Sequence, residues 1–140
     1  MKLRISTLTL LLCSALFTQA ANAEIAVITH PSNASAMDGG AISLIFLGKK
    51  KSFPDGSQAV PVSQTEDAAP TAEFNDKILK KSSSQLKAYW SKLVFTGKGT
   101  PPRSVDNDAA VVSLVSSNPN IIGYVDASSV NDSVKVVATF

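Results

Sequence analysis

Short runs of apolar, β-branched residues alternate with longer segments of helical periodicity, and no other feature of this sequence constrains its fold as tightly. The run Glu-Ile-Ala-Val-Ile-Thr-His at 24–30 is typical of a buried strand, and the same pattern predicts strands at 59–62, 121–125 and 134–138. Apolar stripes and capping residues predict helices over 32–47, 70–79, 82–96 and 107–117. Strands separated by helices need crossover connections, so the sequence predicts an α/β fold whose sheet is covered on both faces.

Residues 1–23 have the layout of a secretory signal peptide. Lys2 and Arg4 precede a short apolar stretch, and the small residues of 21–23 (Ala-Asn-Ala) predict cleavage before Glu24. The only cysteine in the sequence, Cys13, lies inside this leader, so residues 24–140 can form neither a disulfide nor a thiolate metal site. Export without disulfides favours the bacterial periplasm, with residues 24–140 as one domain.

The charge balance excludes one class of partner. Removing Lys2 and Arg4 with the leader takes the formal net charge from +2 to zero. Nucleic-acid binding rests on an excess of basic side chains, so no nucleic-acid partner is expected. Apolar residues make up 44% of the sequence, typical of a globular chain, yet no apolar run is long enough for a transmembrane segment.

Three segments resemble the phosphate-type periplasmic solute-binding proteins of ABC transporters. Residues 41–49 are similar to the family's helix ending in I-F-x-G-K, and residues 89–97 resemble its middle helix pair. The most specific match is Asn-Pro-Asn-Ile-Ile-Gly-Tyr-Val at 118–125, which is similar to the family segment N-P-x-x-I-G-Y-V. The resemblance implies one lobe of a type 2 periplasmic binding protein (PBP domain). That lobe is a three-layer sandwich with a mixed, mostly parallel sheet and helices on both faces.

The chain departs from the family where phosphate-binding relatives hold their anion. Those relatives carry an R-x-D-G-S-G-T loop after the second strand of this lobe, whereas residues 62–71 here read Val-Ser-Gln-Thr-Glu-Asp-Ala-Ala-Pro-Thr. The arginine and the glycines are absent, and Glu66 and Asp67 add negative charge. Phosphate needs charge-assisted donors and free backbone N–H groups, and two carboxylates oppose a dianion.

Candidate ligand-binding residues fall in two segments. In open α/β sheets, ligands bind beyond the carboxyl ends of the strands, and both segments are predicted there. One lies where the first strand feeds a helix, and the other lies at the position of the relatives' anion loop. The candidates are Thr29, Ser32 and Asn33 in the first segment, and Ser63, Gln64, Thr65 and Thr71 in the second. The competing interpretation is that these side chains only cap helices and turns.

No set of residues predicts an enzyme, a metal site or a cofactor. His30 is the only histidine and has no sequence partner, so a structural role is the simpler interpretation. The acidic residues near 66, 106–108 and 126 lack the spacing of a calcium loop. Tyr89 and Trp90 share a helical stripe with leucines, which predicts packing in the core. No catalytic residues are assigned.

Two functional hypotheses remain open at this stage. The first is an exported, single-lobe solute-binding protein, related to phosphate transporter proteins, that binds a small oxyanion such as phosphate weakly. Its partner would be an ABC permease or another envelope protein. The alternative is a periplasmic interaction module that has lost solute binding and docks an envelope partner.

Overall fold

The computed structural model describes residues 24–140, so the predicted leader and Cys13 lie outside the described residues. The chain order alternates strands and helices as the sequence predicts. The strands are β1 (Ile25–Thr29), β2 (Val60–Gln64), β3 (Arg103–Val105), β4 (Ile121–Asp126) and β5 (Lys135–Thr139). The α-helices are α1 (Gly39–Phe46), α2 (Ala69–Phe74), α3 (Ser83–Phe95) and α4 (Asp108–Ser117). A π-helix η1 (Asn75–Leu79) continues α2, and a 3-10 turn η2 (Ala127–Ser129) follows β4.

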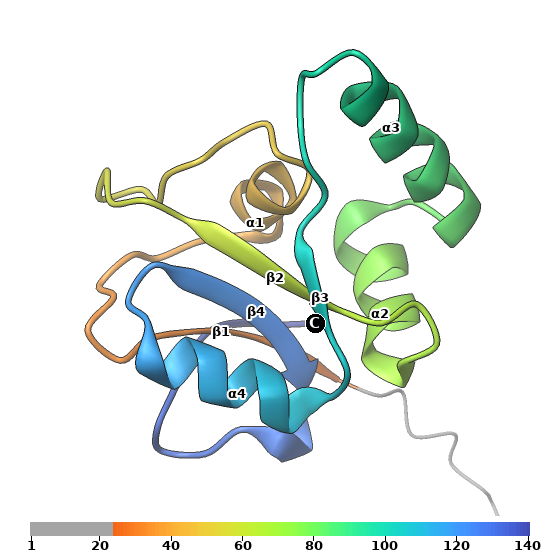
Figure 1. The fold of residues 1–140 in the computed structure, drawn as a ribbon. Helices are drawn as coiled ribbons and strands as arrows, with labels where there is room; N and C mark the ends of the chain where they lie inside the picture. Colours follow the sequence, from red (N-terminus) through yellow and green to blue (C-terminus); the bar gives the residue numbers. More distant parts are fainter. Residues whose placement is uncertain (1–23) are drawn as a thin grey trace, which may run out of the picture.

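The five strands form one mixed sheet in the order β3-β2-β4-β1-β5 (Figure 1). β2 is parallel to both β3 and β4, whereas β1 is antiparallel to both β4 and β5. Four strands therefore run in one direction and β1 runs against them. The predicted mixed, mostly parallel sheet is confirmed. The first residue of β1 also meets the end of the chain, because Ile25 and Phe140 exchange two backbone hydrogen bonds of 2.9 Å.

Helices cover both faces of the sheet. All five residues of β1 are buried, and their side chains alternate between two cores. Ile25 and Val27 belong to the core formed with α1, α2 and η1, whereas Ala26 and Ile28 belong to the core formed with α4. Figure 1 shows α4 on one side of the sheet and α1 on the other. The three-layer arrangement is confirmed.

Gly123 sets how closely α4 approaches the sheet. A Cβ atom at this position of β4 would lie 2.5 Å from Val111 Cγ1 of α4, closer than real Cβ contacts come. Val111 and Val115 are fully buried against β4 at this point. The glycine of the segment 118–125 is therefore a packing requirement, because only hydrogen fits between strand and helix.

The predicted start of the first helix was wrong, and one strand was not predicted. The helix expected from residue 32 begins at Gly39, where the Asp38 side chain caps it by accepting from the Ala41 N–H at 2.8 Å. Residues 33–35 instead form a turn in which the Asn33 side chain accepts from the Ser35 N–H. The sequence also gave no sign of β3, which has three residues and depends on parallel pairing with β2.

Candidate functional site

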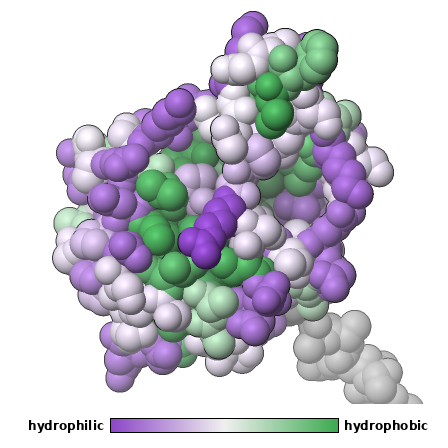
Figure 2. All heavy atoms as spheres, viewed as in Figure 1, coloured by the Kyte–Doolittle hydropathy of each residue, from purple (hydrophilic) through white to green (hydrophobic). Residues whose placement is uncertain are grey.

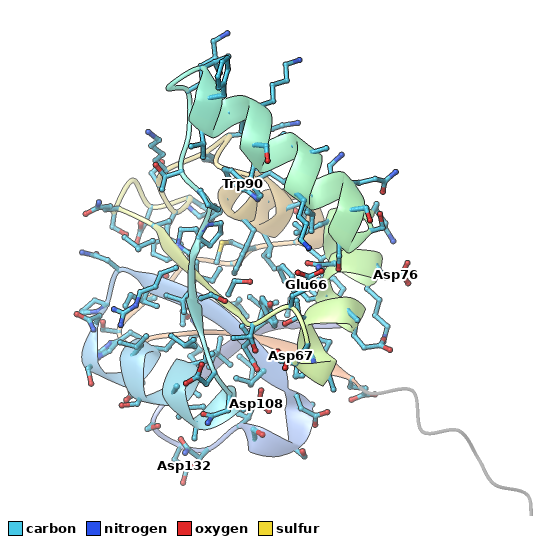
Figure 3. The ribbon with its side chains drawn as sticks, turned by 45° about the vertical axis from the view of Figure 1, so that its right-hand side comes forward. Glu66, Asp67, Asp76, Trp90, Asp108 and Asp132 are labelled. Atoms are coloured by element: carbon cyan, nitrogen blue, oxygen red, sulfur yellow. The ribbon has the colours of Figure 1, made fainter. Side chains whose placement is uncertain are left out.

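A cleft of about 670 Å³ lies between α3 and the carboxyl end of β2. Its floor comes from β2, α2 and η1, α3 forms one wall, and the loop before β3 closes a side. Figure 2 shows the hollow beside α3, and in Figure 3 Trp90 projects from α3 toward the body of the protein. The volume is in the range of small-molecule sites, and the lining is largely apolar.

Helix α3 lies at the edge of the core, against which it packs through Leu86 and Tyr89. It begins with a capping box between Ser82 and Gln85, yet none of its residues is buried. Tyr89 anchors it by donating a hydrogen bond of 2.6 Å to the Leu47 carbonyl oxygen, and Trp90 packs beside Gly48. At its end Phe95 is 93% exposed. The predicted core packing is confirmed for Tyr89, which packs against the core, but was wrong for Trp90, which is half-buried and lines the cleft.

Three hydroxyl groups at the floor of the cleft form a hydrogen-bonded series that we call the hydroxyl relay (Ser63, Tyr124 and Thr71). The Ser63 and Tyr124 hydroxyl oxygens lie 2.9 Å apart, and the Tyr124 hydroxyl donates to Thr71 Oγ1 at 3.1 Å. The Thr71 hydroxyl donates to the Thr65 carbonyl oxygen at 2.8 Å. The buried Gln64 backbone N–H also donates to Tyr124 Oη, at 3.1 Å.

The Thr65 carbonyl oxygen determines which hydroxyl group donates and which accepts along the hydroxyl relay. The Thr65 carbonyl can only accept, so the Thr71 hydroxyl donates there and must accept from Tyr124. Tyr124 has a single phenolic proton, which this bond uses, and the Ser63 hydroxyl must therefore donate to Tyr124. All three hydroxyl protons are used within the protein. The lone pairs of Ser63 are left for a ligand.

Gln64 links the floor of the cleft to α4. Its side-chain amide donates to Asp108 Oδ1 at 2.6 Å and to the Tyr124 carbonyl oxygen at 2.9 Å. Asp108 Oδ2 accepts from the Asp126 backbone N–H at the end of β4. The Ser128 hydroxyl and N–H both donate to the Asp126 carboxylate, which holds the pKa of that carboxyl below its ordinary value. The side-chain amide of Gln64 therefore connects β2 to α4 and to β4 through these two hydrogen bonds.

The cleft has no net charge. Among the described residues that line it, only Glu66 and Lys87 are charged, and their side chains pair at 3.1 Å. Both side chains are more than half exposed, so the pair contributes little to stability. Glu66 lies at the foot of α3 in Figure 3, on the loop that follows β2.

The structure separates the two groups of predicted site residues. Ser63, Gln64, Thr65 and Thr71 gather at the cleft or directly behind it. Thr29, Ser32 and Asn33 lie at the opposite end of the sheet, because β1 is antiparallel to β4 and Thr29 pairs with Ile122 near the start of that strand. The expectation that both segments share one end of the sheet was wrong.

The segment after β1 also lacks the expected helix start. α1 begins only at Gly39, so no helix N-terminus faces Thr29, Ser32 or Asn33. Thr29 Oγ1 and Asn33 Nδ2 are buried without hydrogen-bond partners, and Ser32 Oγ lies 2.7 Å from His30 Nδ1. His30 holds this turn through Ser32, because its Nδ1 also accepts a hydrogen bond of 3.1 Å from the Ser32 backbone N–H.

Two residues at the cleft or directly behind it were not among the candidates. Tyr124 lies in the family-like segment and is fully buried, but only the fold reveals that its hydroxyl joins β2 to α2. Trp90 was assigned to the core because a helical stripe does not show what covers it. Whether an aromatic side chain on such a stripe is buried or exposed depends on the tertiary arrangement of the elements around it.

Residues 24–140 show two further limits on the site. They contain no group of three or more histidine, cysteine, aspartate or glutamate side chains placed to hold a metal ion. No helix in the same part of the chain is long and apolar enough to cross a membrane.

The fold has close counterparts among solved structures. A phosphate ABC transporter substrate-binding protein from Clostridium perfringens, solved with bound phosphate, superposes with a TM-score of 0.65 at 26% identity over 82% of this chain. An ABC-type phosphate transport receptor from Vibrio cholerae gives 0.65 at 15% identity over 82%, and PstS from Borrelia burgdorferi gives 0.59 at 13% identity over 83%. This chain has the fold of the phosphate-type substrate-binding proteins.

The match covers only part of each substrate-binding protein. The chain spans 45% of the Clostridium protein, 46% of the Vibrio receptor and 47% of PstS, as a single PBP-like lobe would. No protein-family model and no curated protein matches the sequence. The structural neighbours are binding proteins rather than enzymes.

Proposed function

We propose that this protein is an exported, single-lobe solute-binding protein that takes a small solute in the cleft beside α3. The observation that carries the proposal is the position of the cleft, at the carboxyl end of β2 where the relatives' anion loop lies. Four of the predicted residues contribute there: Ser63, Gln64 and Thr71 line the cleft, and the Thr65 carbonyl ends the hydroxyl relay. A single lobe leaves its solute half exposed, so affinity is low.

Oxyanions such as phosphate are expected to bind this cleft weakly. The relay protons are used, the N–H groups of Gln64, Ala68 and Thr71 are bonded within the protein, and Pro70 has no N–H. We expect phosphate and sulfate to raise the melting temperature of residues 24–140 only at about 1 mM or above. A Kd of about 1 mM stabilises the folded state by only about 0.4 kcal/mol when the ligand concentration equals Kd. Ser63→Ala should lose that response, because phosphate can gain a relay donor only if the Ser63 proton turns from Tyr124 toward the cleft, whereas Ser113→Ala on α4 should keep it. Micromolar binding, or no response at any concentration, contradicts this prediction.

Export is tested separately from binding. In a Gram-negative host, the expressed chain is expected in the periplasmic fraction with Glu24 as its first residue, measured by intact-protein mass spectrometry. Replacing Ala21 and Ala23 together by leucine should leave the leader attached, because a signal peptidase needs small residues at both positions. A full-length cytoplasmic product from the unaltered sequence is the contrary result.

The proposal includes an envelope protein, such as an ABC permease, that receives the solute. A lobe that docks a partner without binding solute is the less favoured alternative, because a cleft lies at the place where the relatives hold their anion. Cross-linking in envelope extracts, with solute present and absent, tests for the receiving partner.

A further inference from the structure

The polarity of the hydroxyl relay specifies the kind of solute. Resting on the proposed function, we infer that the cleft binds a neutral apolar alcohol, with its hydroxyl group donating to Ser63 Oγ and its hydrocarbon part against α3. Ser63 lines the cleft, is half-buried, and has already donated its proton to Tyr124. What it offers a ligand is therefore a pair of acceptor sites and no donor.

A bound phosphate needs the opposite polarity. Its oxygens accept hydrogen bonds, so a site for it must supply donors. To turn the Ser63 proton toward the cleft, the hydroxyl relay would have to give up the bond between Ser63 and Tyr124. A solute hydroxyl group meets Ser63 without disturbing any bond of the relay.

The apolar walls of the cleft favour a solute whose remaining part is a hydrocarbon. Phe46 and Phe74 lie on the body side, and Leu86, Trp90 and Val94 lie on α3. Figure 2 shows apolar atoms gathered at the free end of α3 above the hollow. An aliphatic or aromatic hydrocarbon part loses contact with water there, which favours binding in proportion to the area covered.

The charges of the cleft disfavour an amine as the hydrogen-bond donor. An ammonium group in an apolar cleft needs a carboxylate partner, since an unpaired charge is costly to remove from water. The carboxylate that lines the cleft, Glu66, is already paired with Lys87 at 3.1 Å. An uncharged hydroxyl donor has no such requirement, so we commit to an alcohol.

Trp90 provides a direct readout. It is the only tryptophan in the sequence and it lines the cleft, so its fluorescence reports occupancy there. The probes are cyclohexylmethanol and methoxycyclohexane, isomers that neither absorb near 295 nm nor differ in composition. Only the first has a hydrogen-bond donor. We expect both to change the Trp90 emission and the alcohol to bind about five-fold more tightly, the contribution of one net hydrogen bond.

Ser63→Ala tests the atom that accepts. This variant should bring the two isomers to about equal affinity, because the acceptor is gone while the apolar walls remain. Ser113→Ala makes the same chemical change on α4, on the other face of the sheet, and should keep the preference for the alcohol. The comparison of isomers on the unaltered protein does not depend on either variant folding.

The outcomes distinguish this inference from the function on which it rests. Equal binding of both isomers by the unaltered protein overturns the alcohol inference but leaves the cleft as a solute site. If inorganic phosphate binds more tightly than cyclohexylmethanol, the alcohol inference is likewise overturned and the cleft remains a solute site. If neither isomer changes the Trp90 emission and neither phosphate nor sulfate changes the melting temperature, the proposed function fails together with the inference.

Discussion

Tyr124→Phe is expected to lower the free energy of unfolding of residues 24–140 by about 1–3 kcal/mol, although the change removes one oxygen atom. The ring should stay in place, because it stacks on Phe74 with centroids 4.0 Å apart and planes 9° apart. The expected loss of stability comes from removing the Tyr124 hydroxyl group. Its removal leaves the buried Gln64 N–H without an acceptor and ends the hydrogen bonds to Ser63 and Thr71.

Tyr89→Phe is the matched control for this prediction. Its hydroxyl makes one hydrogen bond, to the Leu47 carbonyl oxygen, from a half-buried position on α3. The expected loss is about 0.5–1.5 kcal/mol. Urea unfolding of both variants, monitored by circular dichroism, gives the comparison. A loss for Tyr124→Phe no larger than that for Tyr89→Phe would show that the buried relay does not stabilise the fold.

Gly123→Ala is expected to destabilise the protein by about 1–3 kcal/mol through overpacking. The new methyl group would meet Val111 Cγ1 at 2.5 Å, so β4 and α4 must move apart. Adding Val111→Ala should remove the clash, and the double variant should lose less than the sum of the two single losses. Thermal and urea unfolding measure all three free energies.

A second glycine, Gly40, provides a control at which alanine is not expected to destabilise the protein. Gly40 lies in the first turn of α1, where an added Cβ comes no closer than 3.4 Å to another atom. Gly40→Ala should leave stability unchanged or raise it by up to about 1 kcal/mol, because alanine loses less backbone freedom in a helix. If Gly123→Ala is as harmless as Gly40→Ala, the close packing of α4 does not constrain the sequence.

Much of the fold could be predicted because local signals and global packing agree. β1 and β4 are continuous apolar runs, typical of strands covered on both faces, and both are central in the sheet. The Asn107 cap and the stop at Asn118-Pro119 set the two ends of α4. β3 could not be predicted, since a strand of three residues forms only through its neighbour.

The candidate site could be predicted only in part, for a topological reason. Ser63 and Thr71 were found because a polar segment follows a strand, which is a local pattern. Thr29 satisfies the same pattern, but no local signal tells that β1 runs antiparallel to its neighbours and ends at the other side. The relay partner Tyr124 lies more than fifty positions from both hydroxyls it joins. Such contacts exist only after the sheet has formed.

The place of β1 in the sheet has a consequence for biosynthesis. β1 precedes the other four strands in the chain, yet its two hydrogen-bonded neighbours are β4 and β5, and Ile25 also pairs with Phe140. The middle of the sheet therefore cannot form until β4 and β5 have been synthesised. Until then β1 has no hydrogen-bonding partner strand, so cooperative folding must wait for these two strands.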